Sequence, residues 1–600
     1  MSFIELKSPV RRFFCFTKEV FGAKLKRMNK EQLKIFVIEA IELAQKEGKL
    51  PYFDIPRILV EFSERESHGD YATNAALLIG KKIKKNPMEI AENLIKYLQI
   101  GQSIKKIEAK EPGFINFWLS ENELLISLQK ILKEKNKHGA GREKKTMVID
   151  YSSPNIAKSF GVGHLRSTII GQAIYNIYKF LGWKCIGDNH LGDWGTQFGK
   201  LIVATKKWSK KDLKDLKIQD LEDLYVKFHK ESQSDDNLLQ EARDWFKKLE
   251  KGDKEAKKIW KTCVSASLKE FDRVYNILGI KIDYALGESF YQDKADLIIK
   301  EAKKKGLAEK SQNALVIPLS GNKIPLMLLK SDGATTYATR DLATIKYRID
   351  KWNPDLIIWE VGVDQKFYFE QVFKAAEMLD YGKKSQFVHV AHGLIRWPHG
   401  KFSTRKGDTI HLESILEELF KRARKIVDKS KTVKDGSEKQ REKIAKQVAI
   451  GAIKYNDLSR YHAKDIIFDW DSILSLEGNS GPYIQYTAVR CQSVIDRMDS
   501  DSLVFHMNLT DFNQEEVTIL RTIRKFPEIL KEAANNFSPN LICNFIFDLA
   551  QKYNIFYEKH SILKAKTKEK KEFRLALTVA TRQILENSLE LLGISIPQKM

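Results

Sequence analysis

Hydrophobic spacing along the chain predicts an α/β core. The apolar-rich run TMVIDY, residues 146–151, predicts a buried strand. A helix is expected from His164 to Leu181, where apolar residues recur on one side, and Gly182 is expected to end it. The next run, KCIGDN, predicts a second strand. Strand, loop, helix and strand in this order indicate a βαβ unit and hence a parallel sheet of the doubly wound kind.

The segments around this unit divide the chain into further regions. Residues 28–120 mix helical stretches with the strand-like GFINFWL, and residues 205–275 are charged and helical, which predicts an insertion. Four apolar runs, ALVIPL, KIPLML, DLIIWEVG and FVHVAHGLI, are expected to complete the sheet. The pattern after about residue 415 is helical without strands. We predict an extension at 1–27 and domains at 28–120, 121–415 and 416–600.

The charge balance narrows the classes of partner. The 600 residues hold 102 Lys and Arg against 79 Asp and Glu, a net charge of +23. This excess points to a polyanion such as nucleic acid or to an anionic membrane surface, and solubility alone is the plainer explanation. No apolar run approaches the roughly 18 residues of a membrane span. Five cysteines without a CxxC pair argue against a disulfide framework or a structural zinc site and favour a reducing compartment.

The first 27 residues are basic and aromatic and lack the apolar core of a secretory signal. Two interpretations remain open for them. They form either an organellar presequence, which Glu5 and Glu19 weaken, or a poorly ordered extension.

The loop after the first core strand is the best candidate for phosphate binding. Its end, Gly161-Val162-Gly163-His164, lies at a predicted helix start, where free backbone N–H groups and the helix dipole favour an anion. Glycine permits close approach, and His164 is placed to donate to a phosphate, although a histidine there is more often a simple cap. The Walker-like GAGREKKT precedes a strand and lacks the required glycine, so we reject it.

Four motifs together carry a family resemblance. SSPNIAKSFGVGHLRSTIIG, followed by NHLGDWGTQFG, resembles the region around the HIGH motif of class I aminoacyl-tRNA synthetases, and more narrowly of arginyl-tRNA synthetases. KFSTRKG at 401–407 is similar to the family's KMSTRKG loop, and TTYATRDLA and NSGPYIQYTAVR match further motifs. The resemblance runs in order from about residue 28 to 600. It implies a multidomain α/β protein: a Rossmann-like parallel-sheet catalytic domain with a helical insertion, an N-terminal α+β tRNA-binding domain and a C-terminal all-α anticodon-binding bundle.

The resemblance also implies an activity. Arginine would be activated with ATP as substrate and Mg²⁺ as its companion ion, forming arginyl-adenylate, and then transferred to tRNA(Arg). The expected partners are therefore L-arginine, ATP and tRNA(Arg). We expect no membrane partner, no metal site of the protein's own, a monomer and a cytoplasmic location.

The same resemblance assigns roles to individual residues. The catalytic residues would be Lys158, His164 and Lys401. ATP would be bound by Gly161, Gly163, His164, Lys401, Ser403 and Gly407. The arginine pocket would consist of Asn155, Glu288, Tyr337, Asp341 and Gln365, which supply the acids, phenol and amides that a guanidinium requires. Contacts to tRNA would come from Tyr71, Tyr483, Arg490 and Met600.

Departures from the family pattern leave alternatives open. Gly161 stands where the HIGH motif usually begins with histidine, and Phe402 and Thr404 replace a methionine and a lysine of KMSKS. Lys158 would substitute for the missing lysine. A paralogue that binds tRNA without charging it is therefore the main rival, whereas the two acids of the arginine pocket disfavour a synthetase for another amino acid. Without the family, Asp341 would be taken as a surface ion-pair partner of Arg340 or Arg348, and Tyr483 equally as a core residue.

Overall fold

The computed structural model describes residues 28–99, 101–321, 324–397, 400–401, 411–430, 432–433, 435–498 and 511–600. The chain divides into two compact units, each assembled from separated segments. The first contains the chain up to residue 139 together with 487–532 and 544–588. The second contains 140–486, 533–543 and 589–600.

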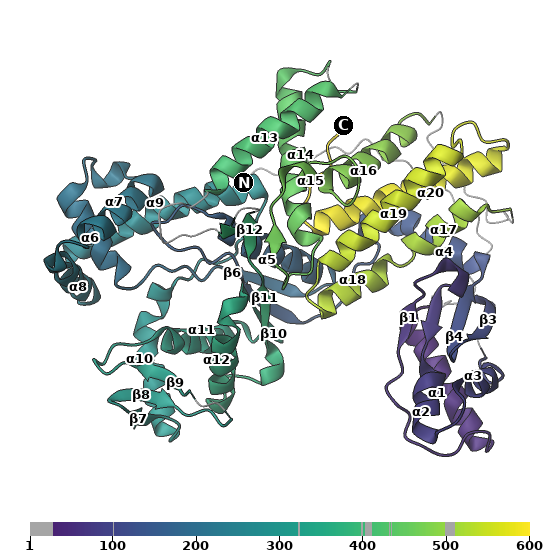
Figure 1. Ribbon diagram of the computed structural model, residues 1–600, viewed down its shortest axis with the longest axis horizontal. Helices are drawn as coiled ribbons and strands as arrows, with labels where there is room; N and C mark the ends of the chain where they lie inside the picture. Colours follow the sequence, from purple (N-terminus) through teal and green to yellow (C-terminus); the bar gives the residue numbers. More distant parts are fainter. Residues whose placement is uncertain are drawn as a thin grey trace. The chain divides into compact units, whose positions relative to one another are not determined.

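A four-stranded parallel sheet forms the core of the second unit (Figure 1). Its strands, in spatial order, are β11 (Phe387–His392), β10 (Leu356–Gly362), β5 (Thr146–Asp150) and β6 (Lys184–Asp188). Helix α5 (Val162–Phe180) connects β5 to β6, so the predicted βαβ unit is confirmed. Gly182 follows the helix with φ 92°, a conformation that glycine adopts without strain. Val148, Ile149, Ile357 and Ile358 are fully buried, as expected of a parallel sheet covered on both faces.

Two of the four runs expected in this sheet lie elsewhere. ALVIPL and KIPLML supply β8 (Ala314–Ile317) and β9 (Leu326–Leu329), which form an antiparallel sheet with β7 (Glu309–Ser311). The prediction was wrong because residues 318–325 are too few for a crossover between parallel strands, which takes about a dozen residues or more. This small sheet belongs to one apolar cluster with α10 (Glu288–Lys304), α11 (Tyr337–Trp352) and α12 (Lys366–Met378).

The predicted helical insertion is present in the second unit. It consists of α6 (Gln197–Trp208), α7 (Ile218–Glu231), α8 (Asp236–Glu250) and α9 (Lys254–Leu278). Val203, Phe228 and Leu238 are among the buried side chains that hold these helices together. The charged residues of the segment lie mainly on the outside, where Lys207 and Lys211 pair with acidic side chains.

The end of the chain is helical, as the pattern predicts. Its helices are α13 (Leu412–Lys429), α14 (Glu438–Leu458), α15 (Trp470–Ile473), α16 (Gly481–Ile495), α17 (Gln514–Ile523), α18 (Phe526–Asn535), α19 (Asn540–Lys559) and α20 (Lys568–Leu591). The expectation of no strand in this region was wrong at one place. Ile466–Ile467 forms β14, because β12 (Ile395–Trp397), which also pairs with β13 (Gly400–Lys401), offers it a free edge.

Residues 28–120 form a mixed α+β structure in the first unit. An antiparallel sheet has the order β1 (Val60–Phe62), β2 (Tyr71–Thr73), β4 (Phe114–Leu119) and β3 (Ile104–Lys110). The helices here are α1 (Lys30–Lys46), α2 (Ala75–Ile83), α3 (Pro87–Ile95) and, after the sheet, α4 (Glu121–Glu134). Along the described chain, no helix is both long and apolar enough to cross a membrane.

Candidate active site

The loop between β5 and α5 is held in a strained shape by side chains around it. Ser152, Ser153 and Ala157 have positive φ angles of 76°, 43° and 61°, which non-glycine residues rarely adopt. The N–H of Ser152 donates to Ser167 Oγ at 3.0 Å and that of Ala157 donates to Ser267 Oγ at 2.9 Å. The surrounding helices therefore fix the loop before any ligand arrives.

The start of α5 presents a neutral histidine. Gly161 is the N-cap, and its N–H donates to His164 Nδ1 at 3.2 Å. The ring proton must then be on Nε2, because Nδ1 accepts. Burial lowers the pKa of His164 to about 4, with the charge of Lys158 acting in the same direction. His164 is thus an uncharged Nε2–H donor beside the free N–H groups of a helix start, a combination suited to phosphate oxygens.

Two expected site residues in the loop between β5 and α5, Asn155 and Lys158, line one small pocket. Asn155 and Lys158 lie in it together with Gln197 and Tyr225 from the insertion, and both side chains are exposed. Asn155 pairs with Gly192 across a parallel bridge, and a Cβ at Gly192 would meet Asn155 Oδ1 at 2.4 Å. The glycine of the NHLGDWG segment therefore allows Asn155 to occupy its position.

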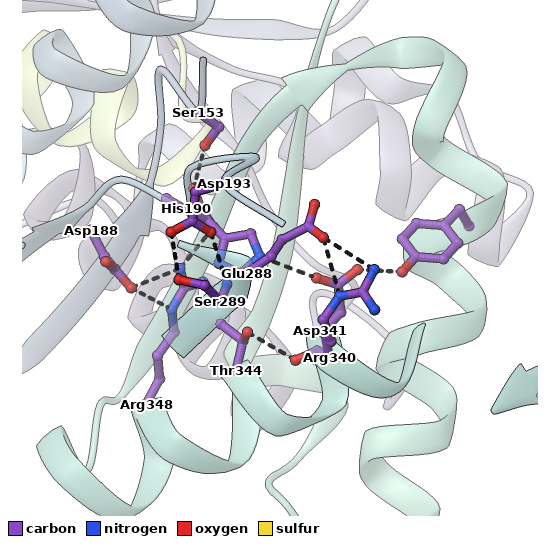
Figure 2. Close-up of polar contacts among 12 residues, drawn as sticks. Ser153, Asp188, His190, Asp193, Glu288, Ser289, Arg340, Asp341, Thr344 and Arg348 are labelled. Carbon is purple, nitrogen blue, oxygen red and sulfur yellow. Dashed lines mark hydrogen bonds and ion pairs between the residues drawn. The ribbon is translucent and has the colours of Figure 1, made fainter. Parts of the chain in front are cut away.

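Two acidic side chains project from the starts of neighbouring helices (Figure 2). Glu288 is the first residue of α10, and Asp341 lies in the second turn of α11. Glu288 Oε2 accepts from Arg340 Nε at 3.1 Å, and a second guanidinium nitrogen of Arg340 lies at the same distance. Asp341 accepts from the hydroxyl of Tyr368, and its other carboxylate oxygen lies 3.8 Å from His190 Nε2. Glu288 therefore already binds a guanidinium, supplied by the chain itself.

Asp193 fixes the helix that carries Glu288. Its two carboxylate oxygens accept from the N–H and the hydroxyl of Ser289, at 2.8 and 2.6 Å. A Cβ at Gly287 would meet the same carboxylate at 2.4 Å. Since Ser289 follows Glu288 in the first turn of α10, this cap orients the Glu288 backbone.

Burial makes both acids weaker than free carboxyl groups. It raises the pKa of Glu288 to about 7, while the charges of Arg340 and His190 oppose the rise. Burial likewise raises the pKa of Asp341, against His190 and the Tyr368 hydroxyl. Two carboxyl groups in a poorly hydrated place gain from a cation bound between them, which relieves their desolvation.

The structure places all five expected arginine-binding residues in the second unit. Tyr337 is 60% exposed at the start of α11, and the Arg340 guanidinium lies 4.8 Å from its ring centre. Gln365 is exposed at the turn after β10. The surface ion-pair interpretation of Asp341 was wrong, because Arg340 binds Glu288 and Arg348 lies buried between Asp150 and Asp188.

Several residues in this site were missed from the sequence. Arg340, Tyr368, His190 and Asp193 all contact the acids or orient them. His190 and Asp193 lie within the NHLGDWG segment, where a histidine and an aspartate three positions apart were the available signal. In the described parts of the chain, no group of three or more His, Cys, Asp or Glu side chains is arranged to hold a metal ion.

Of the KFSTRKG segment, which is expected to bind ATP, the structure describes only the first residue. Lys401 pairs through its backbone with Arg396 in the β12–β13 hairpin. Its side chain, together with Ser403 and Gly407, lies outside the described residues.

Of the residues expected to contact tRNA, Tyr71 is fully buried. Its hydroxyl donates to Glu528 Oε1 and accepts from Arg524 Nη1, each at 2.8 Å. No ring face is left for a base, so the expectation that Tyr71 stacks on tRNA is corrected. Strand β2 (Tyr71–Thr73) directs this ring inward.

The other expected tRNA contacts lie near the chain end. Arg490 donates to Asn554 Oδ1 at 2.6 Å and lies 4.9 Å from the Tyr557 ring centre. Tyr483 is half-buried, and its N–H donates to Ser480 Oγ at 3.2 Å. Met600 is half-buried, and its carbonyl accepts from the Thr432 hydroxyl.

Comparison with known families accounts for nearly the whole chain. Residues 127–470 match the family "tRNA synthetases class I (R), catalytic domain". Residues 484–600 match the DALR anticodon binding domain, and residues 31–119 match the arginyl tRNA synthetase N terminal domain.

Individual proteins are similar over the same extent. An arginine–tRNA ligase of Alkaliphilus metalliredigens is 38% identical over 548 residues, which cover 90% of this chain and 95% of that protein. One from Clostridioides difficile is 39% identical over 550 residues, 90% of this chain and 95% of that protein. The crystal structure of arginyl-tRNA synthetase from Plasmodium falciparum superposes with a TM-score of 0.81 at 27% identity, covering 95% of this chain and 99% of that one.

Proposed function

This chain belongs to the arginyl-tRNA synthetases, and on that premise we propose that it attaches L-arginine to its cognate tRNA through an arginyl-adenylate, using ATP. The observation that carries the proposal is the pair of buried acids, Glu288 and Asp341, in the same unit as a helix start suited to phosphate. A guanidinium and a nucleotide are the two ligands that these features favour.

In the first step, the arginine carboxylate attacks the α-phosphorus of ATP and pyrophosphate leaves. The protein contributes positioning and charge stabilisation to such a transfer. The start of α5 and the Nε2–H of His164 are assigned to the phosphates, together with the ammonium group of Lys158. We assign Lys401, Ser403 and Gly407 to the leaving pyrophosphate, and Gly161 and Gly163 to close backbone approach.

Arginine recognition is assigned to the acid pair and its neighbours. Glu288 and Asp341 bind the guanidinium of the substrate, and Tyr337, Asn155 and Gln365 complete the pocket. Because Arg340 contacts Glu288 at 3.1 Å, the entering guanidinium either joins or displaces it there. In the second step, a hydroxyl of the terminal adenosine of tRNA attacks the arginyl carbonyl carbon; the ester bond forms as the bond to phosphate breaks, and AMP leaves.

Finer assignments extend this proposal. We place tRNA contacts at Tyr483, Arg490 and Met600 and keep the domain bounds 28–120, 121–415 and 416–600. Mg²⁺ is proposed to enter with ATP, because an ion held mainly by substrate phosphates needs no protein cage. A monomer in the cytoplasm completes the proposal.

The test is arginine-dependent exchange of pyrophosphate into ATP, with and without purified tRNA, followed by tRNA charging. We expect exchange with arginine and none above background with lysine, glutamate or cysteine. Binding of tRNA without exchange or charging would instead identify the non-catalytic paralogue, and exchange with another amino acid would reject the pocket assignment.

A further inference from the structure

His411 lies directly opposite the N-cap of the phosphate-binding helix. His411 and Gly161 form an antiparallel bridge, and the N–H of Leu412 donates to the carbonyl of Phe160 at 3.0 Å. Side chains paired across an antiparallel bridge lie on the same face. Since Gly161 has no side chain, the imidazole of His411 is the group that this pair presents there.

The surroundings of Glu222 place the imidazole against the same loop. His411 Nδ1 lies 4.0 Å from Glu222 Oε2, and that oxygen also accepts from the N–H of Ser159 at 3.3 Å and from the Ser159 hydroxyl. One carboxylate oxygen therefore lies near the imidazole and accepts from Ser159, two positions before Gly161. Both chain segments, together with the helix that carries Glu222, belong to the second unit.

Among the described residues, the imidazole forms no hydrogen bond and has only a long contact with Glu222. His411 is the N-cap of α13, where Ser, Thr, Asp and Asn are preferred, yet its side chain makes no capping hydrogen bond. Its Nδ1 is buried and lacks a hydrogen-bond partner among the described residues, and 35% of the side chain remains exposed. A buried polar ring atom without a partner is unusual in a folded protein.

We propose that His411 is a second phosphate-binding imidazole, which contacts ATP through Nε2 from the side opposite His164. This inference rests on the proposed function and adds one residue to that site. His164 Nδ1 accepts from the N–H of Gly161, whereas His411 Nδ1 lies 4.0 Å from Glu222 Oε2, too far for a hydrogen bond. No hydrogen bond to Nε2 of either ring is found among the described residues, so each Nε2 can serve a ligand. Two imidazoles then flank the glycine where a phosphate approaches the backbone.

The two ring nitrogens can be separated by substitution. The amide nitrogen of Gln overlays Nε2, and that of Asn overlays Nδ1. We expect His411→Ala and His411→Asn to lower kcat/KM for ATP at least about tenfold in arginine-dependent exchange, with the KM for arginine unchanged. His411→Gln is expected to recover most of the loss. Glu413→Ala, two residues further on and in an exposed ion pair, serves as the matched control and is expected to behave as the wild type.

Direct titration with ATP alone separates this inference from the proposed function. Weaker ATP binding by His411→Ala supports the inference even if the wild type shows no exchange. Unchanged ATP binding and exchange in His411→Ala would overturn it. Recovery by Asn instead of Gln would also overturn it, because that result assigns His411 to holding Glu222. A wild-type protein that does not bind ATP would reject both proposals.

Discussion

Arginine recognition by this chain should depend on pH through Glu288. The pKa of this buried carboxyl group is about 7, and only its ionised form attracts a guanidinium. A group of that pKa is about 9% ionised at pH 6 and about 91% ionised at pH 8. We therefore expect kcat/KM for arginine to rise roughly tenfold between pH 6 and pH 8 and then to level off.

The assay is pyrophosphate exchange with saturating ATP and tRNA and subsaturating arginine, at constant ionic strength. Because kcat/KM reports groups of the free enzyme, the break should fall near pH 7. Glu288→Gln should lower kcat/KM for arginine and remove the break. The control is the same profile measured with subsaturating ATP and saturating arginine. A flat arginine profile in the wild type, or the same break in Glu288→Gln, would refute the reasoning.

The same carboxyl group makes folding depend on pH in a defined direction. Its folded-state pKa of about 7 lies above the ordinary value of 4.5, so the unfolded chain releases this proton first as pH rises. The stability associated with the protonated group is present below pH 4.5 and is lost progressively up to about pH 7. The loss is at most roughly 3 kcal/mol. Glu288, in the proposed arginine pocket, therefore lowers stability at the pH where it is best able to bind a guanidinium.

Three further predictions concern single residues. Asp341→Asn keeps the shape of the side chain but removes its charge. It should reduce kcat/KM for arginine about 30-fold or more, which corresponds to at least ~2 kcal/mol, and leave kcat/KM for ATP unaffected. A loss of kcat/KM for arginine below threefold in exchange assays would contradict the pocket assignment. A Cβ at Gly163 meets nothing within 4 Å, so Gly163→Ala should raise the free energy of unfolding in urea by up to about 1 kcal/mol. The same methyl group should raise the KM for ATP, because it blocks the close approach of a phosphate to the backbone. An unchanged KM for ATP would remove Gly163 from the site. Tyr71→Phe should lower the free energy of unfolding, measured in urea, by about 1–3 kcal/mol, because Glu528 and Arg524 lose a buried hydrogen-bond partner. The KM for tRNA should stay the same. A raised KM for tRNA would return Tyr71 to the tRNA contacts.

Local pattern was sufficient for those parts of the fold that local spacing determines. The βαβ unit was predicted from apolar runs and from Gly182, and the helical insertion was predicted from the charged, helical pattern of residues 205–275. Sheet membership was not determined in this way, because β8 and β10 carry equally apolar runs and differ only in their partners. The length of the connection to β9 was the available signal for the antiparallel sheet.

The candidate arginine pocket was proposed from the family resemblance, and residue type alone would not have identified it. Glu288 and Asp341 followed from the family resemblance and from the donors of a guanidinium. The environment of these two acids could not be predicted, because their partners lie far away in the sequence. Arg340 binds Glu288 across 52 positions, and Tyr368 binds Asp341 across 27 positions. Burial of Tyr71 likewise depends on Arg524 and Glu528, which no local pattern connects to it.

The discontinuous make-up of the two units has a consequence for biogenesis. The Tyr71 hydroxyl meets an arginine 453 positions later, and Lys454 donates to the carbonyl of Gly593, 139 positions later. At about 5–20 residues per second, a ribosome needs on the order of 20–90 s to make the first of these partners after the tyrosine has emerged. The nascent chain must therefore carry incomplete cores through most of its synthesis. Residues 589–600 complete the unit that contains the proposed active site, so a translation product without them should require chaperone protection.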